Sequence, residues 1–401
     1  MKSAKFNLGL FPRIVIAIAG GICIGFIAPE WFARLCATFN SIFSQFLGFL
    51  IPLIIIGFVA PAIADIGAKA GKMLVATVLL AYMATLLSGM ISYFTGEWLF
   101  PSMLSGVTAV ASGDVDVSTA PYFTVAMPPV MGVMTALVLA FTVGLAVAFM
   151  RPGVLKQLLD ESREVVGRVI TSVVIPLLPV YIFGIFLNMT VVGQVAVILS
   201  TFFKIIVVIF GIHVFVLLLQ YCIAGAVGRR NPLKMLVTML PAYFTALGTQ
   251  SSAATIPVTL KCAVKMDVDK DVAGFTIPLC ATIHMSGSTL KIVACALSLM
   301  IMQGDAFSAG MFLQFIAMLG VTMVAAPGIP GGAIMAALAP LSSVLGFTDQ
   351  QNAMMIALYI AMDSFGTACN VAGDGALAVI INRFFKIRNE SKDRTLVGQQ
   401  A

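Results

Sequence analysis

The sequence contains little charge and lacks the motifs of several protein classes. Only 10% of its 401 residues are charged and only two are histidine, and the net charge of +6 is explained by membrane topology, so no nucleic-acid partner is expected. The seven cysteines form no CxxC pair and neither histidine has a metal-type partner nearby, so disulfides and a transition-metal site are not expected. Two positions before Ser286 stands His284 instead of the glycine of a GxSG nucleophile, which argues against an intramembrane serine protease. No enzymatic activity is expected.

Apolar residues dominate the whole chain. Hydrophobic residues make up 60% of it, and the mean hydropathy is +1.06. Long apolar runs recur from residues 10–28 to residues 353–381, so the hydrophobicity is not confined to one anchor. This composition identifies an integral membrane protein with one multi-pass membrane domain.

The distribution of lysine and arginine predicts the topology. We expect eight transmembrane helices near residues 10–29, 43–64, 73–98, 124–150, 169–192, 198–226, 272–301 and 351–382. With these spans, 20 of the 23 basic residues fall on one side, all except Arg34, Lys204 and Lys291. The positive-inside rule makes that side cytoplasmic, with both termini on it. The expected location is a bacterial-type inner (plasma) membrane.

Two further stretches cannot cross a bilayer as ordinary helices. Residues 241–257 (PAYFTALGTQSSAATIP) and residues 325–335 (AAPGIPGGAIM) are interrupted by Gly, Pro and small polar residues. Basic residues flank the first stretch on both sides, whereas Asp305 and Asp349 flank the second without a basic residue. Each is therefore expected to return to its own side as a re-entrant helical hairpin, and the two hairpins have inverted orientation. Such paired interruptions mark the binding sites of secondary transporters.

The last apolar segment carries an unusual row of polar side chains. Asp363, Thr367, Asn370 and Asp374 are spaced by four, three and four residues, which stacks them on one helical face. A carboxylate at bilayer depth costs about 2.5–3.5 kcal/mol, so each aspartate needs a cationic partner. The partner of Asp363 is either a substrate ammonium or Lys291, and Asp374 is either an ion ligand or a helix-end carboxylate.

Four motifs, in order, resemble the dicarboxylate/amino acid:cation symporter family, which includes glutamate transporter homologues and bacterial serine/threonine symporters. They are SSAATIP at 251–257, ATIHMSG at 281–287, PGIPGG at 327–332, and the segment from Asp363 to Asp374. Weaker similarity covers the amino-terminal half. The resemblance implies a homotrimer with an elevator mechanism. Residues 1–232 would form mainly the scaffold, with the third and sixth spans partly moving with the core. Residues 233–386 would form the transport core, and residues 387–401 a cytoplasmic tail.

The resemblance also implies the roles of individual residues. Asp363 would receive the substrate amino group, Asn370 the α-carboxylate, and Asp374 sodium. The substrate site would comprise Ser251, Ser252, Ser288, Gly328, Ile329, Asp363, Gly366, Thr367 and Asn370. The sodium sites would comprise Asp374, Asn370, Cys280, His284 and Thr282, some through backbone carbonyls. Ser251 and Ser252 would bind a carboxylate at a positive helix end or simply allow close packing of the hairpin.

Departures from the family pattern bear on the substrate. Gly366 stands where members with acidic substrates carry an arginine, and Gln250 and Ser364 stand where another arginine occurs. Without a bidentate partner for a second carboxylate, we expect a neutral substrate such as serine, threonine or alanine, whose side chain Ser288 could bind. Lys291 leaves alternatives open: it recognises an acidic amino acid or C4-dicarboxylate, neutralises Asp363, or lies at the periphery.

The coupling ion is also open at this point. The family's Asn-Met-Asp triplet is replaced by His284, Met285 and Ser286, which removes one ligand carboxylate. Sodium is the expected coupling ion, with no other cofactor, and a proton is the alternative. His284 could carry that proton, because imidazole gains and loses a proton near physiological pH, or it could be a neutral core histidine. A channel is the alternative from another class, but the sequence has no repeated carbonyl filter signature.

Overall fold

The computed structural model describes residues 10–397 except 69–70, 105–119, 152, 194, 325 and 327–330. These residues form helices and contain no β-strand. In chain order the helices are α1 (Leu10–Gly25), α2 (Glu30–Ala68), α3 (Lys72–Met103), α4 (Val133–Phe149), α5 (Val154–Val169), the π-helix η2 (Ile170–Val174), α6 (Ile175–Val191), α7 (Val195–Gly228), α8 (Pro232–Thr249), α9 (Ser252–Lys265), α10 (Lys270–Ile283), α11 (Ser286–Gln303), α12 (Ala309–Val324), α13 (Gly332–Val344), α14 (Asp349–Ala361) and α15 (Asp363–Val397). An all-helical chain satisfies its backbone hydrogen bonds within each segment, as a lipid environment requires.

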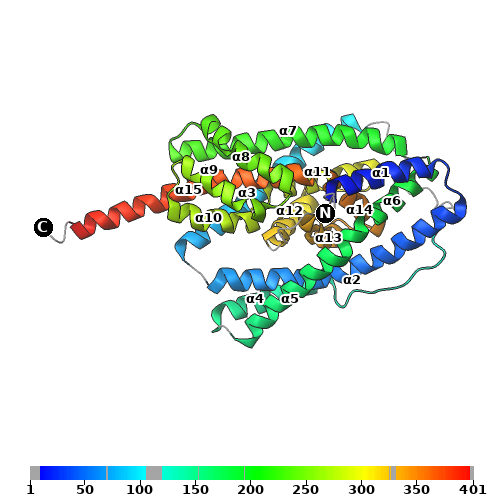
Figure 1. Ribbon diagram of the computed structural model, residues 1–401, viewed down its shortest axis with the longest axis horizontal. Helices are drawn as coiled ribbons and strands as arrows, with labels where there is room; N and C mark the ends of the chain where they lie inside the picture. The colour runs from blue at the N-terminus through cyan, green and yellow to red at the C-terminus, as the bar shows by residue number, and fades with distance from the viewer. Residues whose placement is uncertain are drawn as a thin grey trace, which may run out of the picture.

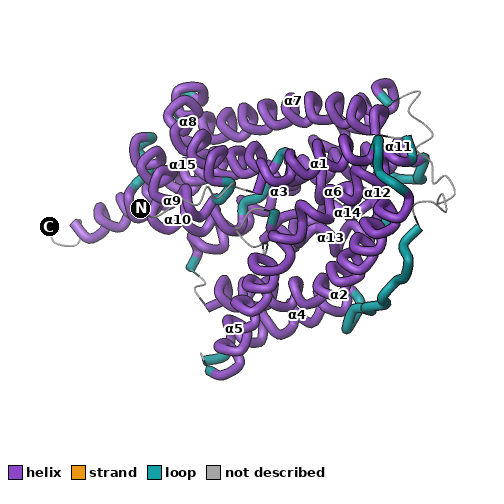
Figure 2. The backbone as a smooth tube through the Cα atoms, turned by 45° about the vertical axis from the view of Figure 1, so that its right-hand side comes forward, coloured by secondary structure: helices purple, strands orange, loops and turns teal. Residues whose placement is uncertain are grey.

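The helices form an elongated bundle with two groups of elements (Figures 1 and 2). In the first group, α2 packs along α4 and α5, and α1 packs along α6. In the second group, α15 contacts α8, α9, α10 and α11. The long helices α3 and α7 pack against α11 and α15, so they are associated with the second group more than with the first.

Six helical spans among the described residues are long and apolar enough to cross a membrane, judged by length and composition alone. They are Glu30–Asp65, Lys72–Met103, Val154–Val191, Phe202–Gly228, Lys270–Gln303 and Asp363–Phe385. The first and fourth expected spans correspond to the shorter apolar helices Pro12–Gly25 and Val138–Phe149. The multi-pass membrane character is thus clear, while the total of eight spans stays a prediction.

Two expected spans are interrupted in the structure. Residues 272–301 are divided into α10 and α11 by an extended His284 and by Met285. Residues 351–382, expected to be one helix, are divided at Met362 into α14 and α15. Both segments are apolar enough on average to be expected as single spans, so hydropathy alone does not reveal these breaks.

The two interrupted stretches both form helical hairpins that converge on one point. In the first hairpin, α8 and α9 pack together and meet at Gln250, whose φ of 53° places it in the left-handed region. In the second, α12 and α13 pack together, and α13 is preceded by Gly331 with φ 76°. The Gln250 side chain donates to Ser364 Oγ at 2.7 Å, and the Gly331 amide donates to Asp363 Oδ2 at 2.8 Å. Both turns therefore contact the start of α15.

The open ends of the hairpins lie at opposite ends of this core. Beyond the first hairpin, the Asp269 amide donates to Asn382 Oδ1 at 3.0 Å, far along α15 from Asp363. Around the second hairpin, the Gln351 side chain donates to Gln303 and to Asp305 Oδ2, the latter at 2.8 Å. α14 leads from Gln351 to the start of α15, so Gln351 and Asn382 lie at opposite ends of the core. The two hairpins therefore enter from opposite ends. This is the inverted arrangement that the flanking charges predict.

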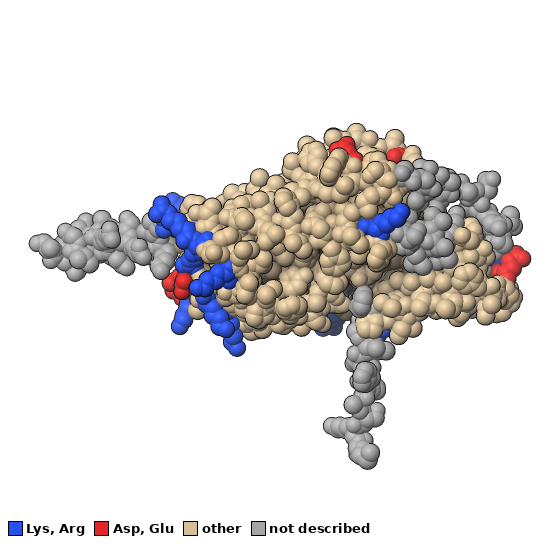
Figure 3. Space-filling model, turned by 90° about the horizontal axis from the view of Figure 1, so that it is seen from above, with Lys and Arg blue, Asp and Glu red and all other residues tan. Residues whose placement is uncertain are grey.

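Basic side chains gather at the end from which α15 projects (Figure 3). Arg230, in the α7–α8 connection, donates to the Asp267 carbonyl of the α9–α10 connection at 3.3 Å. Asn382 on α15 contacts the same carbonyl at 3.5 Å. The basic loops at 229–234 and 261–270 therefore share one end of the molecule, as the alternation of charge in the sequence predicts.

Close packing of α1 on α6 gives a first testable prediction. A Cβ added at Gly21 would lie 2.6 Å from the Phe183 carbonyl oxygen and 3.2 Å from the Leu187 nitrogen. Because both atoms belong to backbone, Gly21→Ala is expected to force the helices apart and to destabilise the protein by about 1–3 kcal/mol. A Cβ at Gly211, within α7, has nothing within 4 Å, so Gly211→Ala is the matched control. Thermal unfolding in detergent measures both, and equal midpoints would contradict the prediction.

Candidate functional site

The candidate site is a row of contacts between α15 and the segment that runs antiparallel to it. His284, Ser288 and Lys291 lie opposite Asp374, Asn370 and Asp363 in that order. The polar residues of α15, spaced by four, three and four, therefore face three polar residues spaced by four and three on the opposite segment. With a rise of about 1.5 Å per residue, Asp363 and Asp374 are roughly 16 Å apart along α15, so each carboxylate needs its own partners.

Asp363 has a cation and a backbone amide within reach. Its Oδ1 lies 3.9 Å from Lys291 Nζ, and its Oδ2 accepts from the Gly331 amide at 2.8 Å. Its side chain is only 5% exposed. Asp363 is also the first residue of α15, where the helix dipole favours a negative charge. The ion pair between Asp363 and Lys291, one of the two partners considered above, is thus present.

Lys291 is fully surrounded by protein. Its Nζ donates to the Met362 carbonyl at 3.0 Å and lies 4.0 Å from the centre of the Tyr359 ring. Its residue is 1% exposed. A Cβ at Gly366 would collide with Cε and Nζ of Lys291. The lysine head therefore lies where the side chain of residue 366 would begin, and a larger residue there would displace it.

Asn370 connects α15 to the start of α11. Its Oδ1 accepts from the Gly287 amide at 2.7 Å, and its Nδ2 donates to Ser288 Oγ at 3.1 Å. Ser288 Oγ also accepts from the Tyr359 hydroxyl at 3.0 Å. Asn370, Ser288 and Tyr359 are all buried. A ligand carboxylate that bound the Asn370 amide would compete with Ser288 for its Nδ2 donor.

The turn of the first hairpin presents serines and a free helix end. Ser251 caps α9, since its side chain accepts from the Ala254 amide at 3.3 Å. Ser252, the first residue of α9, is buried. The hydrogen bond from Gln250 to Ser364 joins the two positions at which an arginine was considered. The positive end of α9 therefore points toward the start of α15, which suits an anion.

A second polar cluster surrounds Asp374. His284 Nδ1 lies 2.9 Å from Asp374 Oδ1, with both side chains at most 1% exposed. On the other side of the ring, Gln220 Nε2 lies 3.5 Å from His284 Nε2 and donates to Ser286 Oγ at 3.1 Å. Gln220 Oε1 is buried without a hydrogen-bond partner among the described residues. An additional donor or a cation beside this oxygen would satisfy it.

Hydroxyl groups of α3 satisfy the backbone where α10 and α11 are separated. Thr85 Oγ1 accepts from the Met285 amide at 3.4 Å, and Ser88 Oγ donates to the Ser286 carbonyl at 2.7 Å. One turn further, Ser92 Oγ donates to the Leu290 carbonyl at 2.6 Å. These three side chains follow the i, i+3, i+7 spacing of one helical face. Non-helical backbone at this depth is thus compensated by a neighbouring helix.

The other predicted site residues divide into three groups. Cys280 and Thr367 are buried near the row, on α10 and α15. Thr282 has an exposed side chain, which donates to the Leu279 carbonyl at 2.7 Å, so only its backbone could reach an ion beside Asp374. Gly328 and Ile329 lie outside the described residues. Within the described part of the chain, no three His, Cys, Asp or Glu side chains are grouped to hold a metal ion.

Three participants were not predicted from the sequence. Gln220 is a buried amide in the largely apolar α7, and an amide within an apolar segment was a usable signal. Tyr359 precedes Asp363 by four residues, but the break at Met362 makes their relation impossible to obtain from helical periodicity. Gly331 belongs to the PGIPGG motif and acts through its amide, which no side-chain pattern indicates.

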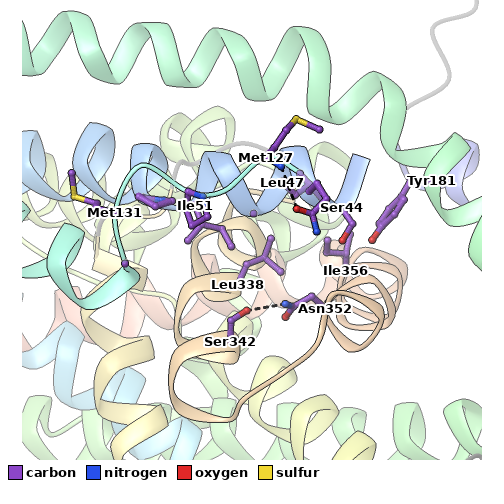
Figure 4. Close-up of a pocket in the computed structure, with 15 residues that line it drawn as sticks. Ser44, Leu47, Ile51, Met127, Met131, Tyr181, Leu338, Ser342, Asn352 and Ile356 are labelled. Atoms are coloured by element: carbon purple, nitrogen blue, oxygen red, sulfur yellow. Dashed lines mark hydrogen bonds between the residues drawn. The ribbon is translucent and has the colours of Figure 1, made fainter. Parts of the chain in front are cut away.

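A separate cavity of about 340 Å³ lies between α2 and α6 on one side and α13 and α14 on the other (Figure 4). On one side it is lined by Ser44, Leu47 and Ile51 of α2 and by Tyr181 of α6. On the other it is lined by α13 and α14, where Asn352 Nδ2 donates to Ser342 Oγ at 2.8 Å. None of the predicted site residues that the structure describes lines this cavity.

Comparison with known proteins identifies the family. A model of the sodium:dicarboxylate symporter family matches residues 10–384. The chain belongs to this family. Its members are transporters, so the protein is a multi-pass membrane transporter and a symporter by family, with a small-molecule substrate and a lipid environment.

Individual relatives differ in how much of their length matches. The serine/threonine transporter SstT of Acinetobacter baylyi is 24% identical over 408 aligned positions, which cover 96% of this chain and all of the relative. Excitatory amino acid transporter 2 of Homo sapiens is 31% identical over 168 residues, or 42% of this chain and 29% of the human protein. The putative sodium-dependent excitatory amino acid transporter glt-4 of Caenorhabditis elegans is 32% identical over 182 residues, or 45% of this chain and 36% of the relative. The aligned part thus spans about a third of each of the two animal proteins.

Proposed function

We propose that this protein is a secondary active symporter of a small neutral amino acid, with sodium as the coupling ion. The observation that carries the proposal is the meeting of two hairpin turns at the start of α15, where Asp363 and Asn370 share a helical face. An ammonium group would pair with Asp363, and the α-carboxylate would bind the Asn370 amide and the amino end of α9, near Ser251 and Ser252. Thr367 lies between these two anchors on α15.

A neutral side chain fits the described site best. No arginine reaches the row among the described residues, and Gly366 leaves no side chain for a second carboxylate. The buried Ser288 hydroxyl, which accepts from Asn370 and Tyr359, would donate its own hydrogen to a small polar substrate. The full-length similarity to a protein named as a serine/threonine transporter supports the same class. The alternative is an acidic amino acid or C4-dicarboxylate bound by Lys291, which would have to release the Met362 carbonyl and leave the Tyr359 ring.

Sodium coupling is supported by the name of the family, and proton coupling by one feature of the site. Asp374 would ligate sodium together with oxygens from Asn370 and from the backbone around Cys280 and Thr282. However, the imidazole of His284 lies directly on Asp374 and offers nitrogen where sodium prefers oxygen. This buried pair favours a proton as the alternative coupling ion.

The elevator division is part of the proposal. Residues 1–232 would supply mainly the scaffold and trimer contacts, with α3 and α7 moving partly with the core of residues 233–386. The cavity between α2 and the α13–α14 region supports this division, because packing is incomplete at the boundary where sliding would occur. The basic end would face the cytoplasm of a bacterial-type cell, together with both termini and residues 387–401. In a channel, by contrast, the turns would line an open pore.

Transport into proteoliposomes tests the proposal. We expect serine to accumulate under an inward sodium gradient and aspartate and succinate to accumulate much less. A pH gradient alone is expected to drive little uptake, because sodium is the proposed partner. Saturable, stereoselective uptake separates a carrier from a channel. Uptake of aspartate or succinate in place of serine would overturn the neutral substrate, and uptake driven only by the pH gradient would replace sodium by a proton.

A further inference from the structure

Lys291 is the one ammonium group that the described structure places beside Asp363. The two side chains are within ion-pair distance at 3.9 Å, and both are almost completely buried. A substrate ammonium would approach the same carboxylate. Two ammonium groups on one carboxylate of a buried site repel each other, so the lysine and the substrate are competitors for Asp363.

Lys291 can give up its contact with Asp363 and keep its contacts with Met362 and Tyr359. At 3.9 Å the lysine nitrogen is beyond a direct hydrogen bond to the carboxylate, whereas its bond to the Met362 carbonyl is 3.0 Å long. The Tyr359 ring offers a further cation-binding face at 4.0 Å. Lys291 therefore keeps two neutral partners when another cation takes Asp363. A carboxylate-binding role would instead require it to leave both.

Asp363 is also the residue that the second hairpin contacts. The Gly331 amide, next to the hairpin turn, donates to Asp363 Oδ2, while Lys291 lies on the Oδ1 side. The carboxylate can thus hold the hairpin and a cation at once. A buried carboxylate without a cation is costly, so the hairpin closes readily on Asp363 only when a cation is also there.

We infer that Lys291 is a tethered replacement for the substrate ammonium, which lets the carrier close and return without substrate. This inference rests on the proposed function. When substrate binds, its ammonium displaces Lys291 from Asp363 toward Met362 and Tyr359. When substrate leaves, Lys291 pairs with Asp363 again and the second hairpin closes over a neutral pair. The lysine thereby makes net uptake possible, where a carrier without it would mainly exchange substrate for substrate.

The test compares net uptake with exchange in proteoliposomes that contain Lys291→Met. Methionine retains the unbranched stem over Gly366 and removes the charge. We expect the ratio of exchange to net uptake of radiolabelled serine to rise by about tenfold or more, because only the substrate-free return loses its cation. The KM for exchange is expected to fall, since the competitor for Asp363 is gone. Lys204→Met, an exposed lysine of α7, is the matched control.

Three outcomes would contradict the inference. An unchanged ratio in Lys291→Met would show that Lys291 does not serve the return step. Loss of aspartate or succinate uptake with no effect on serine would make Lys291 an acid-recognising residue. If the variant does not fold, the wild-type protein still decides: strict exchange without net uptake would overturn the inference. Absence of transport of any amino acid by the wild type would instead contradict the proposed function.

Discussion

Asp363→Asn is expected to abolish amino acid uptake. Asparagine has nearly the same shape but carries no charge for an ammonium group. Removing one partner from a buried charge pair costs about 2–5 kcal/mol or more, so uptake should fall by roughly 30-fold or more. Uptake of radiolabelled serine into proteoliposomes measures the effect. Asp160→Asn, at an exposed carboxylate of α5, is the matched control and should retain uptake.

The effect of Asp363→Asn must be separated from loss of the fold. The substitution leaves the Lys291 ammonium without its carboxylate, which itself costs stability in a buried site. The double variant Asp363→Asn with Lys291→Met removes both charges and restores neutrality. We expect it to recover thermal stability but not uptake, because the ammonium site is still missing. Recovery of uptake in this double variant would contradict the role of Asp363 in substrate binding.

Asp374→Asn is expected to cause the second large loss, in coupling to the ion gradient. Asp374 is the only carboxylate that contacts the buried His284 and Gln220 cluster among the described residues. Neutralising it removes the charge that attracts a cation into this part of α15, so gradient-driven accumulation should fall by about tenfold or more. Uptake with and without an imposed sodium gradient measures the coupling. Asp271→Asn, near the exposed start of α10, is the matched control.

The partner residue distinguishes the two coupling ions. His284→Asn introduces the residue that the family resemblance places at this position, and it replaces imidazole by an amide oxygen that sodium can use. If sodium drives transport, this variant should retain sodium-driven uptake. If the wild type is driven by a pH gradient, the variant should lose that drive. Equal pH-driven uptake in both proteins would exclude His284 as the proton carrier.

Features that depend on neighbouring residues in the sequence could be predicted, and features that depend on distant residues could not. The row from Asp363 to Asp374 was predicted correctly as one helical face, because helical periodicity is a local property of consecutive residues. His284, Ser288 and Lys291 all contact this face of α15, although the helix is interrupted between His284 and Ser288. That interruption was not predicted, because it is stabilised by Thr85 and Ser88, which lie about 200 residues away.

The sequence by itself determined the membrane environment, the two hairpins, the polar face of α15 and the family. Each follows from composition, from Gly and Pro in fixed positions, or from short-range spacing. Only the tertiary structure decided that both hairpin turns meet at the start of α15, that Lys291 lies over Gly366, and that Gln220 completes the cluster at Asp374. These contacts join residues 32 to 114 positions apart, so they depend on how whole helices pack, and local patterns carry no information about that packing.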